Sequence, residues 1–235
     1  LNAPIVNPTG AVYSNQELND ILQFARTNQL SIVMDSIFSG LEFSSTNHWD
    51  IADNVQAFSN SPDSNIIVMG GLSKEYAAGG LRFGYAWTSS KTIASRLHLE
   101  LPQEPHFTLG YAVRKLLNAQ LNENSCLLEH LSAQQSILSG RAAKLTQQLE
   151  RLGWRVLPPK GGLFLVAKPQ NCEGLSQAQQ IELADQAAKK MFEQLNVAIN
   201  NATWTGLPGY CRFVLSCSQE AFDEAIRRLE SIEQE

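Results

Sequence analysis

Hydrophobic and polar positions follow two patterns along the first part of the chain. Between residues 15 and 28, apolar residues recur every three or four positions, which predicts an amphipathic helix. Ser14 and Glu17 have the spacing of a capping box at its start, because each side chain can bond the other residue's backbone amide. Residues 30–34 are mostly apolar without helical spacing, which predicts a buried strand that ends at Asp35.

The same alternation of helix and strand continues after Asp35. Residues 65–69 form a second apolar run, which leads into a glycine-bearing loop at residues 70–80, and residues 82–87 are predicted to form another strand. Helices that alternate with buried strands indicate an α/β fold with a mostly parallel sheet. Ligands in such sheets bind beyond the carboxyl ends of the strands, so we expect Asp35 and Lys74 to lie near a site.

The second half of the chain has a different rhythm. Helices are predicted at residues 91–100, 107–120, 126–150, 176–194 and 219–233, and strands at 154–157, 163–166 and 212–215. The helix over 126–150 is long enough to link two domains. We therefore expect a partial large domain at residues 1–125 and a smaller α+β domain at residues 126–235. Because the chain begins just before a turn, we also expect it to be a segment of a longer protein.

Composition narrows the range of partners. The chain has 235 residues and is 43% hydrophobic, which is ample for a packed core. A net charge of −5 argues against a nucleic-acid partner, and the lack of a long apolar run argues against a membrane span. The four cysteines form no CxxC pair and the four histidines are scattered, so we expect reduced thiols, a cytoplasmic location and no metal site. A small-molecule ligand fits this composition better.

Lys74 lies in a loop of small residues that directly follows a predicted buried strand. A lysine in a loop is usually a solvated surface charge, whereas burial beside other cations would suit it to form a Schiff base. Arg82, eight residues later, changes this interpretation. A guanidinium beside glycines and the hydroxyl of Ser73 can bind a phosphate. Together these residues predict a cofactor that carries both a phosphate and an aldehyde.

Three further polar residues have a structural and a functional interpretation. Asp35 either begins a turn or keeps the pyridine nitrogen of such a cofactor protonated. Asn7 either belongs to an Asn-Pro turn or donates to the cofactor's phenolic oxygen. Arg212 either forms a structural ion pair or binds a substrate carboxylate. Its position in an otherwise apolar strand, where an unpaired charge is costly, favours the ligand.

These motifs occur in the order and approximate spacing of class I/II aminotransferases, and the resemblance covers nearly the whole chain. The matching segments are Asn7-Pro8-Thr9-Gly10, Asp35, Ser73-Lys74, Arg82-Phe83-Gly84, Pro159-Lys160-Gly161-Gly162-Leu163-Phe164 and Arg212. The resemblance implies the fold type I of pyridoxal 5′-phosphate (PLP) enzymes, with the N-terminal half of that fold missing. It also implies PLP as cofactor, an amino acid or keto acid as substrate, and a homodimer.

The resemblance implies a role for each motif residue. Lys74 would be the catalytic Schiff-base lysine, and Asp35 and Asn7 would contact the pyridine nitrogen and the phenolic oxygen. Ser73 and Arg82 would bind the phosphate, and Arg212 the α-carboxylate of the substrate.

Two positions depart from the aminotransferase pattern. The family usually has a tyrosine three residues after the aspartate, where this chain has Phe38, which packs beside the cofactor but lacks the hydroxyl. It usually has a serine three residues before the lysine, where this chain has Gly71. Residues 38–43 and 204–213 further resemble the aminotransferase-like C-terminal region of methionine S-methyltransferases, in which a methyltransferase domain precedes this region.

Three functions are compatible with these residues. The first is a PLP-dependent aminotransferase-like domain in a protein of the methionine S-methyltransferase type. In that case Lys74 would move the α-proton of the amino acid and Arg212 would orient it. The second is a regulatory module that binds an amino acid or a sulfonium compound without turnover. The third is a PLP-dependent lyase or decarboxylase, since fold alone does not determine the reaction.

Overall fold

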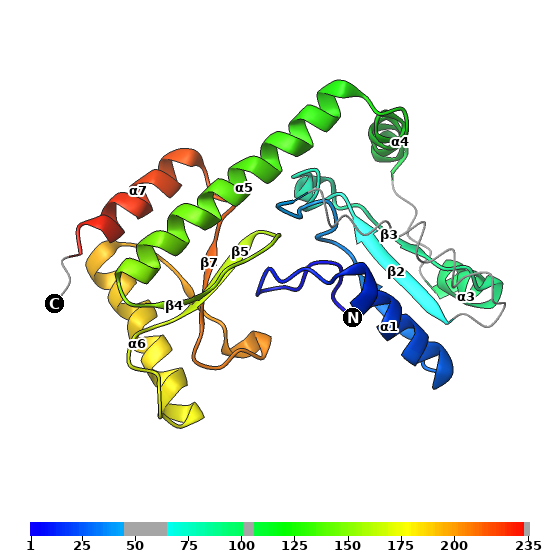
Figure 1. Ribbon diagram of the computed structural model, residues 1–235. Helices are drawn as coiled ribbons and strands as arrows, with labels where there is room; N and C mark the ends of the chain where they lie inside the picture. Colours follow the sequence, from blue (N-terminus) through cyan, green and yellow to red (C-terminus); the bar gives the residue numbers. More distant parts are fainter. Residues whose placement is uncertain (45–64, 101–105, 233–235) are drawn as a thin grey trace. The chain divides into compact units, whose positions relative to one another are not determined.

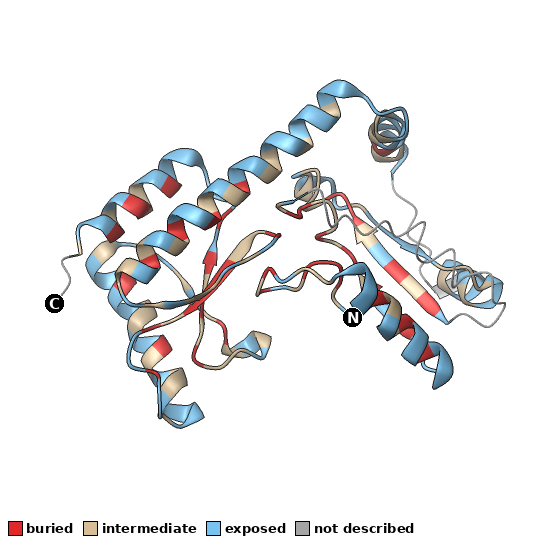
Figure 2. Cartoon of the chain, in the orientation of Figure 1, coloured by how far each residue is buried: buried red, intermediate tan, exposed pale blue. Residues whose placement is uncertain are grey.

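The computed structural model describes residues 1–44, 65–100 and 106–232. The chain forms two compact units. Unit 1 contains residues 1–5 and 12–135, and unit 2 contains residues 6–11 and 136–235. Figure 1 traces both units along the sequence, and Figure 2 colours the same view by burial.

Unit 1 is built on a three-stranded mixed sheet with the strand order β1-β2-β3. Its elements are α1 (Asn15–Thr27), β1 (Ile32–Asp35), β2 (Ile66–Gly71), η2 (Gly79–Leu81), β3 (Gly84–Trp87), α3 (Lys91–Glu100), α4 (Phe107–Leu121) and the first part of α5 (Ser125–Arg151). β1 and β2 are parallel, with Asp35 beside Met69, whereas β3 runs antiparallel to β2. The carboxyl ends of β1 and β2 therefore meet at one edge of the sheet.

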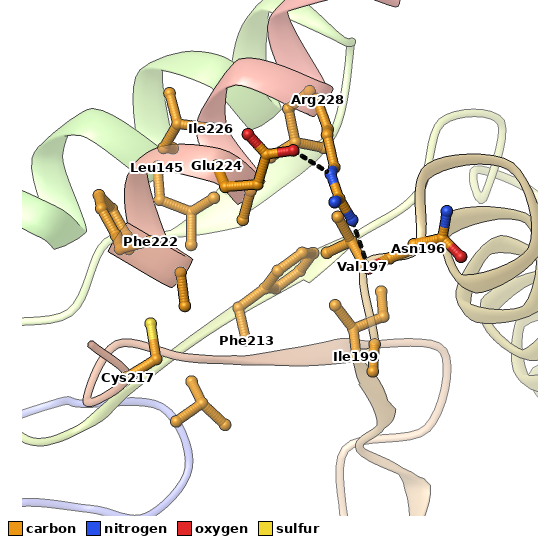
Figure 3. A pocket seen from close by; sticks show the side chains of 15 residues that line it. Leu145, Asn196, Val197, Ile199, Phe213, Cys217, Phe222, Glu224, Ile226 and Arg228 are labelled. Atoms are coloured by element: carbon orange, nitrogen blue, oxygen red, sulfur yellow. Dashed lines mark hydrogen bonds and ion pairs between the residues drawn. The ribbon is translucent and has the colours of Figure 1, made fainter. Parts of the chain in front are cut away.

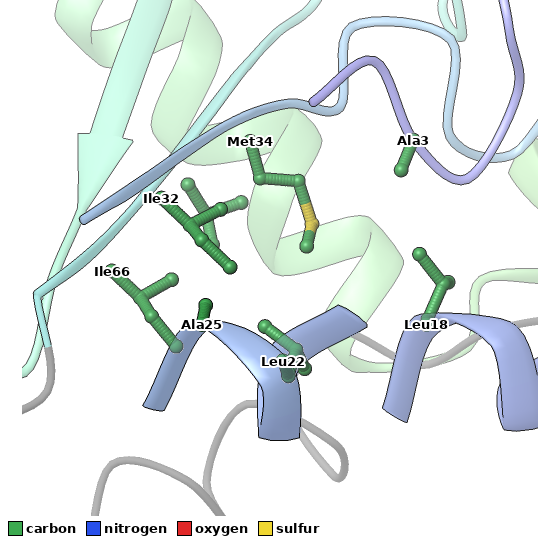
Figure 4. Close-up of a cluster of buried hydrophobic side chains, with 8 residues drawn as sticks. Ala3, Leu18, Leu22, Ala25, Ile32, Met34 and Ile66 are labelled. Carbon is green, nitrogen blue, oxygen red and sulfur yellow. The ribbon is translucent and has the colours of Figure 1, made fainter. Parts of the chain in front are cut away.

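The predicted capping box determines where α1 begins. Ser14 Oγ accepts from the Glu17 amide at 3.2 Å, and the Glu17 carboxylate accepts from the Ser14 amide at 2.8 Å. The apolar stripe of α1 packs on one face of β1 and β2, as Figure 4 shows. The buried side chains of this cluster are Ala3, Leu18, Leu22, Ala25, Ile32, Met34, Ile66 and Val68. This core fixes β1 and β2, and thereby the loops at their carboxyl ends.

The prediction of a strand over residues 82–87 was wrong at its first two positions. Arg82 follows the 3₁₀ turn η2 and has a φ of +51°, in the left-handed region, which is incompatible with an extended strand. The strand β3 begins only at Gly84. The turn places the Arg82 side chain beside the loop that carries Lys74.

Unit 2 contains a four-stranded antiparallel sheet with the order β4-β5-β7-β6. Its elements are the remainder of α5, β4 (Arg155–Leu157), β5 (Phe164–Lys168), α6 (Gln177–Leu195), β6 (Asn200–Asn201), η3 (Thr203–Thr205), β7 (Cys211–Val214) and α7 (Gln219–Glu230). Ser176 and Ser218 cap α6 and α7 as predicted. Helix α7 ends at Glu230, before the predicted end, and residue 233 lies outside the described residues.

Two glycine-bearing loops meet closely in unit 2 although they are far apart in the sequence. The Lys160 amide donates to the Gly10 carbonyl at 2.7 Å. A Cβ on Gly10 would lie 2.4 Å from Pro159 Cβ and 2.7 Å from the Gly161 carbonyl oxygen, and Gly10 has a φ of +68°. Only glycine fits there. The motif at residues 7–10 therefore belongs to unit 2.

Candidate functional site

Lys74 lies in a turn that follows the carboxyl end of β2. The Ala77 amide donates to the Lys74 carbonyl at 3.2 Å, and the Ala78 amide donates to the Leu72 carbonyl at 3.2 Å, so the backbone on both sides of Lys74 is held. The Lys74 Nζ lies 5.9 Å from the centroid of the Phe38 ring. Among the described residues it has no ion pair, so no carboxylate there occupies its amine.

Ser73, Gly79 and Arg82 cluster on the same loop. A Cβ on Gly79 would lie 3.7 Å from the Ser73 carbonyl oxygen, so the two residues are neighbours within the loop. Arg82 Nη1 donates to the Gly79 carbonyl at 3.3 Å, and no carboxylate in the described part of the chain pairs with this guanidinium. Most of its donors are therefore open to an anion. A hydroxyl and a guanidinium on a glycine-bearing loop can hold a phosphate.

Asp35 ends β1, at the sheet edge from which the Lys74 loop also leaves. Its Oδ1 accepts from the Ile37 amide at 3.2 Å, as in the predicted turn, whereas no partner for its Oδ2 is found in the described ranges. The turn uses Asp35 Oδ1 and leaves Oδ2 available, so the two predicted roles of Asp35 are compatible. Sequence reasoning missed the neighbouring Ser36, which is 5% exposed and whose Oγ has no hydrogen-bond partner among the described residues.

Phe38 is buried, with 5% of its surface exposed, and faces the Lys74 amine. Two amide side chains of α5 hold the surrounding loops. Gln135 Nε2 donates to the Gly40 carbonyl at 2.8 Å, and Gln134 Nε2 donates to the Glu75 carbonyl at 2.7 Å. The loop that follows Phe38 and the loop that contains Lys74 are therefore both bonded to α5.

Two tyrosines beside the Lys74 loop were not predicted. Burial, reinforced by the nearby Glu75 carboxylate, raises the pKa of Tyr76 to about 12 and also raises the pKa of Tyr85. Both hydroxyls therefore stay protonated at neutral pH and can donate hydrogen bonds. Tyr85 covers Gly70, where a Cβ would lie 2.5 Å from its Oη. Their spacing in the sequence shows no periodicity that would have indicated this cluster.

Gly71 leaves no space for the serine that the family usually has there. A Cβ would lie 2.8 Å from the Phe83 carbonyl oxygen and 3.1 Å from Ile37 Cδ1. A side chain would push the backbone of Phe83 away, and residue 84 pairs with Gly71 across the two strands. A serine therefore does not fit at residue 71, because β2 and β3 approach closely here.

The other two predicted residues belong to unit 2. Asn7 is exposed in the turn that Gly10 closes against the loop at residues 159–161. Arg212 lies in β7 beside Val166 of β5 and Asn200 of β6. Its side chain is half-buried on the sheet face opposite Cys211 and Phe213, which pack towards the helices.

Aromatic rings surround the Arg212 guanidinium instead of carboxylates. Its Cζ lies 4.4 Å from the centroid of the Phe164 ring and 4.8 Å from that of the Trp204 ring. Burial lowers the pKa of Arg212. Its Nε is buried without a hydrogen-bond partner among the described residues, and no ion pair to Arg212 is found there. The predicted alternative of a structural ion pair thus finds no partner in that part of the chain.

Other arginines of unit 2 donate hydrogen bonds to backbone carbonyls of the same chain. Arg141 donates to the carbonyls of Leu215 and Cys217 at 2.7 and 2.8 Å, and Arg151 and Arg228 likewise donate to backbone carbonyls. These three side chains fix helix ends and loops. Arg212 differs because no such acceptor is found among the described residues, which is the property expected of a ligand-binding arginine.

Unit 2 also contains an apolar pocket of about 390 Å³ between α7, β7 and the segment that follows α6 (Figure 3). The charged residues at its wall already pair with one another, because Arg228 Nε lies 2.8 Å from Glu224 Oε1. Arg228 also donates to the Leu195 and Asn196 carbonyls. The pocket therefore presents no unpaired charge to a ligand, and we assign it no chemistry.

The described ranges contain neither a candidate metal cluster nor a membrane-spanning helix. No cluster of three histidine, cysteine, aspartate or glutamate side chains there could hold a metal ion. In the same ranges, no helix combines the length and the apolar character needed to cross a membrane.

Comparison with known proteins agrees with this arrangement. The family model described as aminotransferase class I and II matches residues 3–229. A methionine S-methyltransferase from Arabidopsis thaliana is 31% identical over 97% of this chain, and an aspartate aminotransferase from Bacillus sp. (strain YM-2) is 27% identical over 98%. The chain spans 22% of the first relative and 56% of the second.

The fold is shared with solved aminotransferase structures. The aromatic aminotransferase from Pyrococcus horikoshii OT3 matches 97% of this chain with a TM-score of 0.78 and 22% identity, and the chain covers 57% of that structure. This likeness confirms the predicted fold type I, of which the chain contains about half.

Proposed function

Because the chain belongs to the class I and II aminotransferase family, we propose that unit 1 holds PLP and that Arg212 of unit 2 binds the carboxylate of an amino acid. The observation that carries this proposal is the set of polar groups left open at one sheet edge of unit 1. Asp35 Oδ2, Lys74 Nζ and most donors of Arg82 have no hydrogen-bond or ion-pair partner in the described ranges.

The open groups fit the parts of PLP. A carboxylate suits the pyridine nitrogen, an amine suits the aldehyde, and the pair of Ser73 and Arg82 suits the phosphate. When bound, the cofactor supplies an electron sink that makes the α-proton of an amino acid acidic. In the proposal, Asp35 maintains positive charge on the ring, Lys74 Nζ accepts and returns the α-proton, and Arg212 orients the amino acid through its carboxylate.

Covalent trapping in the full-length protein tests the role of Lys74. We expect borohydride reduction with bound PLP to label one peptide, the one that contains Lys74. Lys74→Ala should abolish the label, whereas Lys91→Ala, at the start of α3, should retain it. A label on Lys91 or Lys160 would refute the assignment.

Substitution of two arginines separates binding from stability. Arg212→Lys keeps the charge but loses the bidentate fork, so it should weaken amino-acid binding by about 1.5–3 kcal/mol and leave PLP binding unchanged. Arg141→Lys should instead lower the melting temperature, because Arg141 donates to three protein acceptors. Equal loss of amino-acid and PLP binding in Arg212→Lys would indicate a structural role.

A second candidate function is amino-acid binding without turnover, in a protein of the methionine S-methyltransferase type. The observation that favours it is the pair of departures near Lys74. Phe38 is buried where the family has a tyrosine hydroxyl, and Gly71 has no space for the serine. Single-turnover measurements on the full-length protein distinguish the two candidates, since only the first converts an amino acid to its keto acid. The homodimer and the cytoplasmic location stay predictions.

A further inference from the structure

We propose that Trp204 is a positioning residue for carboxylate binding, which holds the Arg212 guanidinium while leaving its N–H donors to the ligand. This inference rests on the proposed function of Arg212. It adds a role for Trp204, to which the sequence motifs assign none, although the residue lies in the segment 204–213 that resembles methionine S-methyltransferases.

The contact between Trp204 and Arg212 joins two separate parts of unit 2. Arg212 lies on β7, and Trp204 lies in the 3₁₀ turn η3, eight residues earlier in the chain. The ring centroid of Trp204 lies 4.8 Å from Arg212 Cζ, within the range of a cation–π interaction. Phe164 of β5 contributes a second ring at 4.4 Å.

Aromatic partners leave the arginine available in a way that a carboxylate would not. A carboxylate would occupy the two parallel donors of the guanidinium and neutralise its charge. A ring attracts the same cation through its π-electrons and accepts no hydrogen bond in the bidentate geometry. The guanidinium thus keeps a fixed position together with its positive charge and its fork of donors.

Hydrogen bonds hold the turn around Trp204, although Trp204 itself is exposed. The Thr203 amide donates to Asn201 Oδ1 at 2.7 Å, and Thr205 Oγ1 donates to the Ala202 carbonyl at 2.6 Å. The Trp204 side chain is 69% exposed, so it contributes little to the core. A large exposed ring on a well-bonded turn, in contact with an unpaired arginine, is explained by ligand binding rather than by folding.

Binding of an unreactive carboxylate provides the test. The probe is 3-(methylthio)propionate, which has no amino group to react, titrated by calorimetry into the PLP-loaded full-length protein. Trp204→Leu should weaken its binding about two- to fivefold, the range of an exposed cation–π contact. Trp204→Phe should restore most of the affinity, because a ring is retained.

A matched tryptophan serves as the control. Trp87 of β3 is 43% exposed and has no ring–cation contact among the described residues, so Trp87→Leu should leave the affinity unchanged. Arg212→Gln should weaken binding at least about tenfold. The double variant Trp204→Leu/Arg212→Gln should bind no more weakly than Arg212→Gln alone, since Trp204 acts through the arginine. Melting temperatures should be equal for wild type and Trp204→Leu.

The outcomes distinguish carboxylate binding by Arg212 from positioning of Arg212 by Trp204. If Arg212→Gln binds the probe like wild type, the proposed function of Arg212 fails. If Arg212→Gln weakens binding but Trp204→Leu does not, only the positioning role is refuted. Additive losses in the double variant would show that Trp204 contacts the ligand directly. A lower melting temperature for Trp204→Leu would show a structural role, and either result overturns the inference.

Discussion

Replacing Gly71 with serine would restore the residue that the family usually has three positions before the lysine, and we expect it to destabilise unit 1. The new Cβ would lie 2.8 Å from the Phe83 carbonyl oxygen, 3.1 Å from Ile37 Cδ1 and 3.3 Å from Gly84 Cα. Two of these three atoms are backbone, which cannot rotate away. Overpacking of this kind typically costs about 1–3 kcal/mol.

The measurement is thermal unfolding of the full-length protein with each of three substitutions. Gly71→Ser and Gly71→Ala should both lower the transition of unit 1, at about 2–8 °C per kcal/mol for domains of ordinary size. Gly80→Ala is the control, because a Cβ there meets nothing within 4 Å. It should be neutral or slightly stabilising. If Gly71→Ser melts like wild type, β2 and β3 do not approach as closely as described, and the explanation for the missing serine is wrong.

Three further predictions concern other parts of the chain. Phe38→Tyr should lower by about one unit the pKa at which the visible absorption of the PLP-loaded protein changes, because the new hydroxyl can donate to the phenolic oxygen. Spectrophotometric titration measures this pKa. An unchanged pKa would mean that residue 38 does not face the phenolic oxygen. Hydrogen bonds from Arg227 and Arg228 lower the pKa of Glu224 from 4.5 to about 2. The stability that Glu224 contributes is therefore fully present above pH 4.5 and is lost as the pH falls towards 2, and Glu224→Gln should remove this part of the pH dependence in urea titrations. Gly10→Ala should destabilise unit 2 by about 1–3 kcal/mol, because the new Cβ would clash with Pro159. Gly140→Ala, in the open middle of α5, should instead stabilise it by about 0.5–1 kcal/mol. Equal unfolding midpoints for the two variants would contradict the close loop contact.

Local signals in the sequence predicted most of the elements. The capping box at Ser14 and the apolar runs before Asp35 and Lys74 depend on neighbours within a few residues, so helix α1 and strands β1 and β2 were found close to their observed bounds. The direction of β3 was not predicted, because an apolar run looks the same in parallel and antiparallel pairing. β6 was missed because two asparagines have neither length nor strand propensity.

In the candidate site, too, local features could be predicted from the sequence and contacts between distant segments could not. The roles proposed for Asp35, Lys74 and Arg82 follow from residue type, order and spacing alone, and they stay predictions. The surroundings that make them available depend on contacts between distant segments. Phe164 and Trp204 reach Arg212 from a neighbouring strand and a turn, and Gly71 is constrained by a carbonyl across the sheet. The hydrophobic periodicity of the sequence does not predict such contacts.

The contact between Gly10 and the loop at residues 159–161 has a consequence for biosynthesis. The six residues 6–11 belong to unit 2, yet the ribosome makes them about 150 residues before their partners. At about 5–20 residues per second, they wait about 8–30 s before Lys160 is added, and longer until it leaves the exit tunnel. During that time unit 1 can close around β1 and β2, both of which follow residues 6–11 in the sequence. Completion of unit 2 is therefore the later event, and a nascent chain arrested before residue 160 would display an exposed turn at residues 7–10.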